Sequence, residues 1–331
     1  MAAMIARLTE GLSRRALGLL AALLAVLLAA PWIANDYLLT VLIVILYLAY
    51  TGQAWNIMMG FAGQLSLGHA LYVGLGAYVS AALSIFWGIP PILGLFPAMV
   101  VAALVGAAIG FLSFRFAVKG VHFTLLTIAF AEIARIVFQH LTILGGTGGL
   151  FLPVEARSGV DLIHLRGDPR MFYYVILAMG LGLFLLCRWL LASPLGYRWQ
   201  ALREDPAAAE SLGVPLLRVK LAAISLSAAL TAAGGVFAAF FYNALFPDQW
   251  FGLGYSIEII LAPIIGGLGT LFGPILGALL LTPLGELISS ATDALGWQAA
   301  GIKPFCYGIV LLAIVKFLPD GIWPAIRRRL S

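Results

Sequence analysis

Three polar side chains lie close together in a glycine-rich stretch, residues 60–70. This stretch places Gln64, Ser66 and His69 within an otherwise apolar region. Glycines weaken helical continuity and let backbones approach closely. Two interpretations fit: tight helix packing in which the polar groups find partners, or a broken helix whose polar groups line the path of a small solute. We take these three residues as candidates for such a path.

Two charged side chains stand inside a second apolar stretch, residues 121–140. Glu132 and Arg135 are three positions apart, so on a helix they share one face and can pair. Charges within a membrane segment are costly and usually face a cavity or the bundle interior. The pair is either structural, near a helix end, or part of a proton or ion relay. We add both residues to the candidate path.

A polar island interrupts the apolar chain at residues 192–217. Asp205 is a good helix N-cap and Pro206 suits the first helical position, so we expect a short helix over residues 207–212 that ends at Gly213. The simplest interpretation is a solvated loop. However, the capping residues and a face of small residues between charges fit a helix that docks in a groove of another protein. The candidate contact residues are Arg203, Glu204, Asp205, Ala207, Ala208, Glu210 and Gly213.

The residue types that most enzymes use are present without the spacing that catalysis needs. None of the lysines completes the G-x-x-x-x-G-K-[ST] pattern of an ATP-binding loop, and the 4 histidines show no metal-ligand spacing. No G-x-S-x-G nucleophile motif occurs. Cys187 and Cys306 lie in apolar surroundings and are expected to be small packing residues. We therefore expect no catalytic site, no metal and no cofactor in this chain.

Composition indicates a polytopic, all-α integral membrane protein. Hydrophobic residues make up 63% of the 331 residues and charged residues only 10%, far less charge than a soluble chain exposes. Apolar runs of about 20 residues recur, and backbone groups in lipid must bond within helices. We expect one transmembrane domain over residues 1–331 with about ten helices, some of them broken or re-entrant. The expected spans are residues 16–34, 37–59, 72–84, 93–114, 121–140, 172–191, 217–242 and 302–318.

The sequence allows two arrangements for residues 256–288. They form either two short spans, or a re-entrant pair followed by a span. Glycines at 266, 267, 269 and 273 interrupt this region, as glycines interrupt residues 60–68. Paired interruptions in the two halves of a transporter point to a transport site at a repeat interface.

Three ordered motifs resemble one family, the LivM-type permeases of branched-chain amino acid ABC transporters. Residues 60–70 resemble the family pattern G-x-x-G-Q-x-S-L-G-H-A, and residues 127–135 resemble T-x-A-F-x-E-I-x-R. Residues 201–213 resemble the A-x-R-E-D-x-x-A-A-E-x-x-G of the cytoplasmic coupling loop. The resemblance covers nearly the whole chain.

The resemblance implies a permease subunit of an importer in the bacterial inner membrane. Its implied partners are a LivH-like permease, two cytoplasmic ATPase subunits and an external solute-binding protein, with no role for nucleic acid. The implied substrates are branched-chain or other hydrophobic amino acids, and related systems carry urea, amides or aromatic acids. The Glu132–Arg135 pair is then expected to be mainly structural, near the inner surface of the permease pair.

The basic residues fit one orientation in the membrane. Most of the 19 lysines and arginines fall on one side when the N-terminus is cytoplasmic, and Arg7 and Arg327 then lie inside with both chain ends. The apolar run after Arg7 resembles a signal peptide, but its length and the spans that follow favour an uncleaved first helix. The polar island is also cytoplasmic in this orientation. The rival interpretation, an ion-coupled carrier with Glu132 and Arg135 as its relay, has no use for a docking helix.

Overall fold

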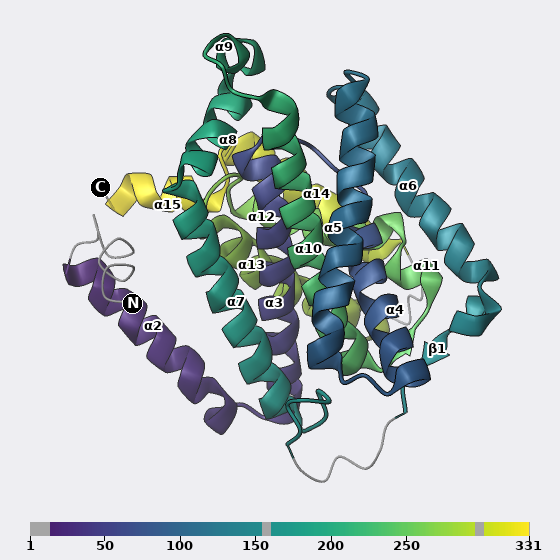
Figure 1. The fold of residues 1–331 in the computed structure, drawn as a ribbon. Coiled ribbons are helices and arrows are strands. Elements are labelled where there is room, and N and C mark those ends of the chain that lie inside the picture. Colours follow the sequence, from purple (N-terminus) through teal and green to yellow (C-terminus); the bar gives the residue numbers. More distant parts are fainter. Residues whose placement is uncertain (1–13, 154–159, 295–300, 331) are drawn as a thin grey trace.

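The computed structural model describes residues 14–153, 160–294 and 301–330, which fold into a bundle of helices (Figure 1). Arg7 lies outside the described residues. The α-helices are α2 Arg14–Ile33, α3 Asp36–Asn56, α4 Ala70–Trp87, α5 Pro91–Arg115, α6 Val121–His140, α7 Pro169–Leu191, α8 Pro194–Glu204, α9 Pro206–Ser211, α10 Leu216–Tyr242, α11 Pro247–Trp250, α12 Leu253–Gly266, α13 Gly273–Ala294, α14 Ile302–Phe317 and α15 Ile322–Leu330. Short helical turns are η1 Ile57–Phe61, η2 Thr142–Leu144 and η3 Gly146–Gly148, and the strands are β1 Leu150–Phe151 and β2 Ala244–Leu245.

Eight helical segments of the described chain are long and apolar enough to cross a membrane. They are Asp36–Phe61, Ala70–Trp87, Pro91–Arg115, Val121–His140, Pro169–Leu191, Leu216–Tyr242, Pro247–Gly266 and Gly273–Ala294. Two shorter apolar helices, Leu24–Ile33 and Pro304–Ile314, accompany them. The all-α polytopic fold is confirmed. The region for which the sequence allowed two arrangements, residues 256–288, lies in two helices, α12 and α13, which a bend at residues 267–272 joins.

Local sequence explains where several helices begin. Asp168, Ser193 and Asp205 each precede a proline and cap the helix that follows, α7, α8 and α9 respectively, by accepting backbone N–H groups. Proline at the first helical position loses nothing by lacking an N–H, because that N–H has no partner within the helix. Within the polar island that follows α7, the Ser193–Pro194 step begins α8 and the Asp205–Pro206 step separates α8 from α9.

Helices α3 and α10 form the centre of the bundle. α10 packs against α5, α4 and α3, while α3 also contacts α7, α12 and α13. Alanine and glycine dominate the buried part of α10, so neighbouring backbones approach it closely. Cys187 is a free, buried thiol in this core, as expected of a packing residue, and Cys306 is free and partly buried.

The bundle has two distinguishable ends. Helices α8 and α9 lie at one end, here called the loop end, and β1 lies near the opposite end, here called the far end (Figure 1). The two strands pair antiparallel, with Leu150 opposite Leu245 and Phe151 opposite Ala244. This pairing ties the segment after α6 to the segment after α10.

Candidate functional site

The polar island folds into two helices rather than the single short helix that the sequence predicted. The predicted cap is confirmed: Asp205 Oδ1 accepts from the backbone N–H groups of Ala207, at 2.8 Å, and Ala208, at 3.1 Å. Gly213 has a φ of +83°, a left-handed conformation that ends α9 and that glycine adopts without strain. The preceding helix α8 was not foreseen.

The outer face of α9 is smaller than the sequence suggested. Ala207 and Ala208 are exposed, but Ala209 is only 2% exposed and faces the protein itself. Leu212 extends the free face instead, because its side chain is 83% exposed. Glu204 and Glu210 are exposed beside this face. The exposed face of α9 therefore consists of Ala207, Ala208 and Leu212, with charged residues at its edge.

Helix α8 anchors this loop to the bundle. Trp199 and Leu202 are buried, and the Trp199 indole donates to the Val219 carbonyl of α10 at 2.9 Å. At the end of α8, Arg203 turns towards the bundle: its Nη1 donates to the Gly60 carbonyl at 2.5 Å. This bond ties its guanidinium to η1, and the predicted contact of Arg203 with a partner protein stays a prediction.

Asn56 joins the two glycine-interrupted segments. Its Nδ2 donates to the Thr270 carbonyl and its Oδ1 accepts from the Gly269 N–H, both at 2.9 Å. A Cβ on Gly60 would lie 1.8 Å from Asn56 Oδ1 and 2.7 Å from the Gly269 nitrogen. Only glycine at position 60 therefore lets the two glycine-interrupted segments approach each other. Arg203 bonds to the same residue from the side of the α8–α9 loop.

His69 lies in a closed hydrogen-bond network. Its Nε2 is 2.9 Å from Ser227 Oγ, and its Nδ1 is 3.2 Å from Ser66 Oγ. Because the Ser227 hydroxyl donates to the Ala54 carbonyl, Nε2 carries the proton and Nδ1 accepts from Ser66. His69 is 0% exposed and Ser66 1% exposed. Both side chains thus pack within this chain, and their predicted place along a solute path stays a prediction.

The rest of the 62–69 segment packs on α6. Thr127 Oγ1 accepts from the Leu67 N–H at 3.2 Å, and Thr124 Oγ1 donates to the Leu65 carbonyl at 3.1 Å. Gln64 is partly exposed, and its side chain donates only locally, to the Ala62 carbonyl at 3.1 Å. Of the three polar residues predicted here, Gln64 is the one that is not buried, and its place along a solute path also stays a prediction.

The predicted Glu132–Arg135 pair forms, with Arg135 Nε and Nη2 donating to the two carboxylate oxygens of Glu132 at 2.9 and 2.5 Å. A third partner completes it: Asp248 of α11 accepts from Arg135 and from Gln139. The expected position near the inner surface of the permease pair stays a prediction. The side chains of Glu132 and Arg135 are 48% and 25% exposed, not enclosed in the bundle.

The roles of two residues in these clusters were not predicted from the sequence. Asn56 and Asp248 each bond to segments more than one hundred positions away in the chain. A signal existed for Asn56, an amide at the end of a long apolar span that directly precedes the glycine-rich stretch. No local pattern distinguishes Asp248 from an ordinary loop carboxylate.

Comparison with known proteins agrees with this architecture. The model of the family described as "Branched-chain amino acid transport system / permease component" matches residues 37–315. The high-affinity branched-chain amino acid transport system permease protein LivM of Escherichia coli is 30% identical, over 94% of this chain and 76% of its own length. In Methanocaldococcus jannaschii, a probable LivM is 23% identical, over 82% of this chain and 84% of its own, and a probable LivH is 28% identical, over 78% and 84%.

No solved structure matches the chain at a significant level. The family model nevertheless spans every helix from α3 to α13 and most of α14, so it includes the glycine-interrupted segments and the α8–α9 loop. Together with the LivM relative of Escherichia coli, which covers nearly the whole chain, this match shows that the chain belongs to the family of permease components of branched-chain amino acid transport systems.

Proposed function

We propose that this chain is a transmembrane subunit of an ATP-driven importer that carries branched-chain or other hydrophobic amino acids across the bacterial inner membrane. The proposal rests on family membership and on the printed names of the LivM and LivH relatives. Its partners are a LivH-like second permease, two cytoplasmic ATPase subunits and an external solute-binding protein. The loop end and both chain ends are cytoplasmic in this arrangement, as the distribution of basic residues favours.

The link from the α8–α9 loop to the membrane segments supports the energy coupling in this proposal. The exposed face of α9, with Ala207, Ala208 and Leu212, docks on an ATPase subunit. Its displacement moves α8, whose Arg203 holds the Gly60 carbonyl at 2.5 Å. From Gly60 the motion reaches Asn56 and the 267–272 bend, so the loop acts on both interrupted segments at once.

A charged substitution on the α9 face tests this proposal. Ala208→Glu places a carboxylate on the docking face, where it loses hydration without gaining a partner. We expect the ATPase subunits to dissociate during purification of the complex and ATP-driven uptake to fall to background, while the chain still inserts in the membrane.

The matched control is Ala294→Glu, an alanine at the end of α13 that is also exposed. We expect it to retain the ATPase subunits, because α13 runs away from the loop end. Full retention of the subunits and of uptake in Ala208→Glu would contradict the docking role of α9.

A further inference from the structure

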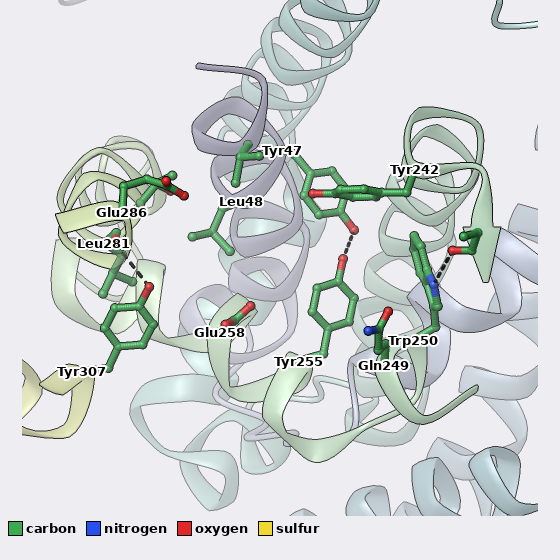
Figure 2. Close-up of a pocket in the computed structure, with 13 residues that line it drawn as sticks. Tyr47, Leu48, Tyr242, Gln249, Trp250, Tyr255, Glu258, Leu281, Glu286 and Tyr307 are labelled. Carbon is green, nitrogen blue, oxygen red and sulfur yellow. Dashed lines mark hydrogen bonds between the residues drawn. The ribbon is translucent and has the colours of Figure 1, made fainter. Parts of the chain in front are cut away.

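A cavity of about 400 Å³ opens in the half of the bundle that carries β2 and α11. Residues of α3, α10, β2, α11, α12, α13 and α14 line it, and Figure 2 shows their side chains. This volume is within the range of small-molecule sites, roughly 300–1,000 Å³. The residues already described at the loop end and at the Glu132–Arg135 pair do not line it.

Two carboxylates from membrane segments line this cavity, Glu258 of α12 and Glu286 of α13. Figure 2 shows Glu286 on one side of the space, with Glu258 between it and an aromatic group on the other side. The Tyr37 hydroxyl donates to Glu286 Oε2 at 3.0 Å. None of the described lining residues is basic. Carboxylates in membrane segments are costly and generally serve a function, so this pair favours a cationic guest.

A second observation points to a ligand independently of the carboxylates. Thr282 of α13 lines the same cavity and is only 8% exposed, yet its hydroxyl has no hydrogen-bond partner among the described residues. A buried hydroxyl without a partner loses its hydration without compensation. A polar group of a bound molecule would supply the missing bond.

The remaining wall is aromatic and held in place. Tyr47 and Tyr255 share a hydrogen bond of 2.5 Å between their hydroxyls, which joins α3 to α12. The Trp250 ring lies edge-on to Tyr242 and to Tyr255, with ring centroids 6.2 and 6.1 Å apart. Aromatic rings accept both apolar side chains and cations on their faces. Gln249, beside them, offers an amide donor.

We propose that this cavity binds a zwitterionic amino acid with an apolar side chain, as a substrate site on the far side of the permease. The ammonium group lies between Glu258 and Glu286 and bonds to Thr282. The apolar side chain packs on Tyr242 and Trp250. This inference rests on the proposed function and deepens it, because it assigns recognition of the ammonium group to named residues of this chain.

The binding arm of the test uses the full-length chain in lipid nanodiscs and follows tryptophan fluorescence. The probes are L-leucine, 3-methylbutylamine, which lacks the carboxylate, and 4-methylpentanoate, which lacks the ammonium. We expect leucine and the amine to bind and the acid not to bind. Trp250→Phe should remove most of the signal. Absence of leucine and amine binding, or equal binding of the acid, would overturn the proposal.

Substitutions of the carboxylates locate the site. Glu258→Gln and Glu286→Gln should each weaken leucine binding by about tenfold, as loss of a charge-assisted bond does. Asp293→Asn, an exposed carboxylate on the same helix as Glu286, is the matched control and should bind as the unaltered chain does. Thr282→Val keeps the shape of the side chain and should also weaken leucine binding. It provides the test if Glu258→Gln or Glu286→Gln fails to fold. Unchanged affinity in all three site variants would exclude this cavity.

An uptake arm separates this inference from the proposed function. In the assembled transporter, Glu258→Gln and Glu286→Gln should raise the KM for leucine while ATP still drives uptake. Normal uptake by both variants would show that the cavity is not the substrate site, and it would not contradict the proposed importer function. Failure of the unaltered transporter to carry any hydrophobic amino acid would instead overturn the proposed function, and amine binding would then test the cavity alone.

Discussion

At the scale of single residues, Arg203 and Asn56 connect parts of the chain that are far apart in sequence. Arg203 bonds to Gly60 and Asn56 bonds to Gly269 and Thr270, so three segments meet within one group of hydrogen bonds. Each bond involves a backbone group, whose position changes when its segment moves. The arrangement therefore makes the two interrupted helices respond together to a displacement of α8.

Removing the Arg203 guanidinium should uncouple the loop from these segments. Because a bond from a charged donor contributes about 1.5–3 kcal/mol, its loss shifts a two-state equilibrium by about tenfold or more. A cysteine in place of Gln64 reports the change through its reactivity with a small thiol reagent in the assembled complex. We expect nucleotide to change this reactivity with Arg203 present and to leave it unchanged in Arg203→Gln.

Two results would count against this account. Equal nucleotide dependence in both backgrounds would show that Arg203 does not transmit the motion. Complete protection of the cysteine in every state would favour simple packing of residues 60–70. Arg198→Gln, an exposed arginine of the same helix, is the control and should behave as the unaltered protein.

The cluster of Glu132, Arg135 and Asp248 predicts an order of stabilities. Arg135→Gln leaves two carboxylates close together without their cation, whereas Glu132→Gln leaves Arg135 paired with Asp248. Arg135→Gln should therefore lower the melting temperature in detergent more than Glu132→Gln or Asp248→Asn, and all effects should shrink at high salt. An equal or larger loss in Glu132→Gln would show that Asp248 contributes little.

At the scale of helices, features with a local sequence signal could be predicted. Span limits follow from apolar length, and the predicted span 121–140 coincides with α6, while 217–242 differs from α10 by one residue. The Asp205 cap and the Glu132–Arg135 pair depend on neighbours within three positions and were also predicted. Helix α8 was missed because its buried face, with Trp199 and Leu202, is defined by contact with α10 and not by strong periodicity.

Long-range contacts explain what could not be predicted. Ala209 reads as part of a free small-residue face, yet the way α9 returns to α10 buries it. Asp248 reaches Arg135 only because the segment after α10 folds back on α6. The cavity carboxylates Glu258 and Glu286 stand in apolar segments, a signal that the sequence analysis passed over. Their common cavity depends on how α12 and α13 pack on α3.

At the scale of the whole molecule, the two ends of the bundle have separate tasks in the proposed importer. The loop end receives the motion of the ATPase subunits through α9 and α8, and the far end offers the cavity to an amino acid. The interrupted segments, residues 57–69 and 267–272, lie between these regions. An ion-coupled carrier would instead need a charged relay enclosed in the bundle, but the side chains of Glu132 and Asp248 are 48% and 65% exposed.

The energy source of uptake tests this account most directly. The measurement follows leucine uptake by the assembled transporter in proteoliposomes, with the proton gradient dissipated and internal ATP held constant, and then with the gradient intact and ATP absent. The account predicts that uptake persists in the first condition and stops in the second. Uptake that collapses with the gradient while ATP is held constant would contradict it.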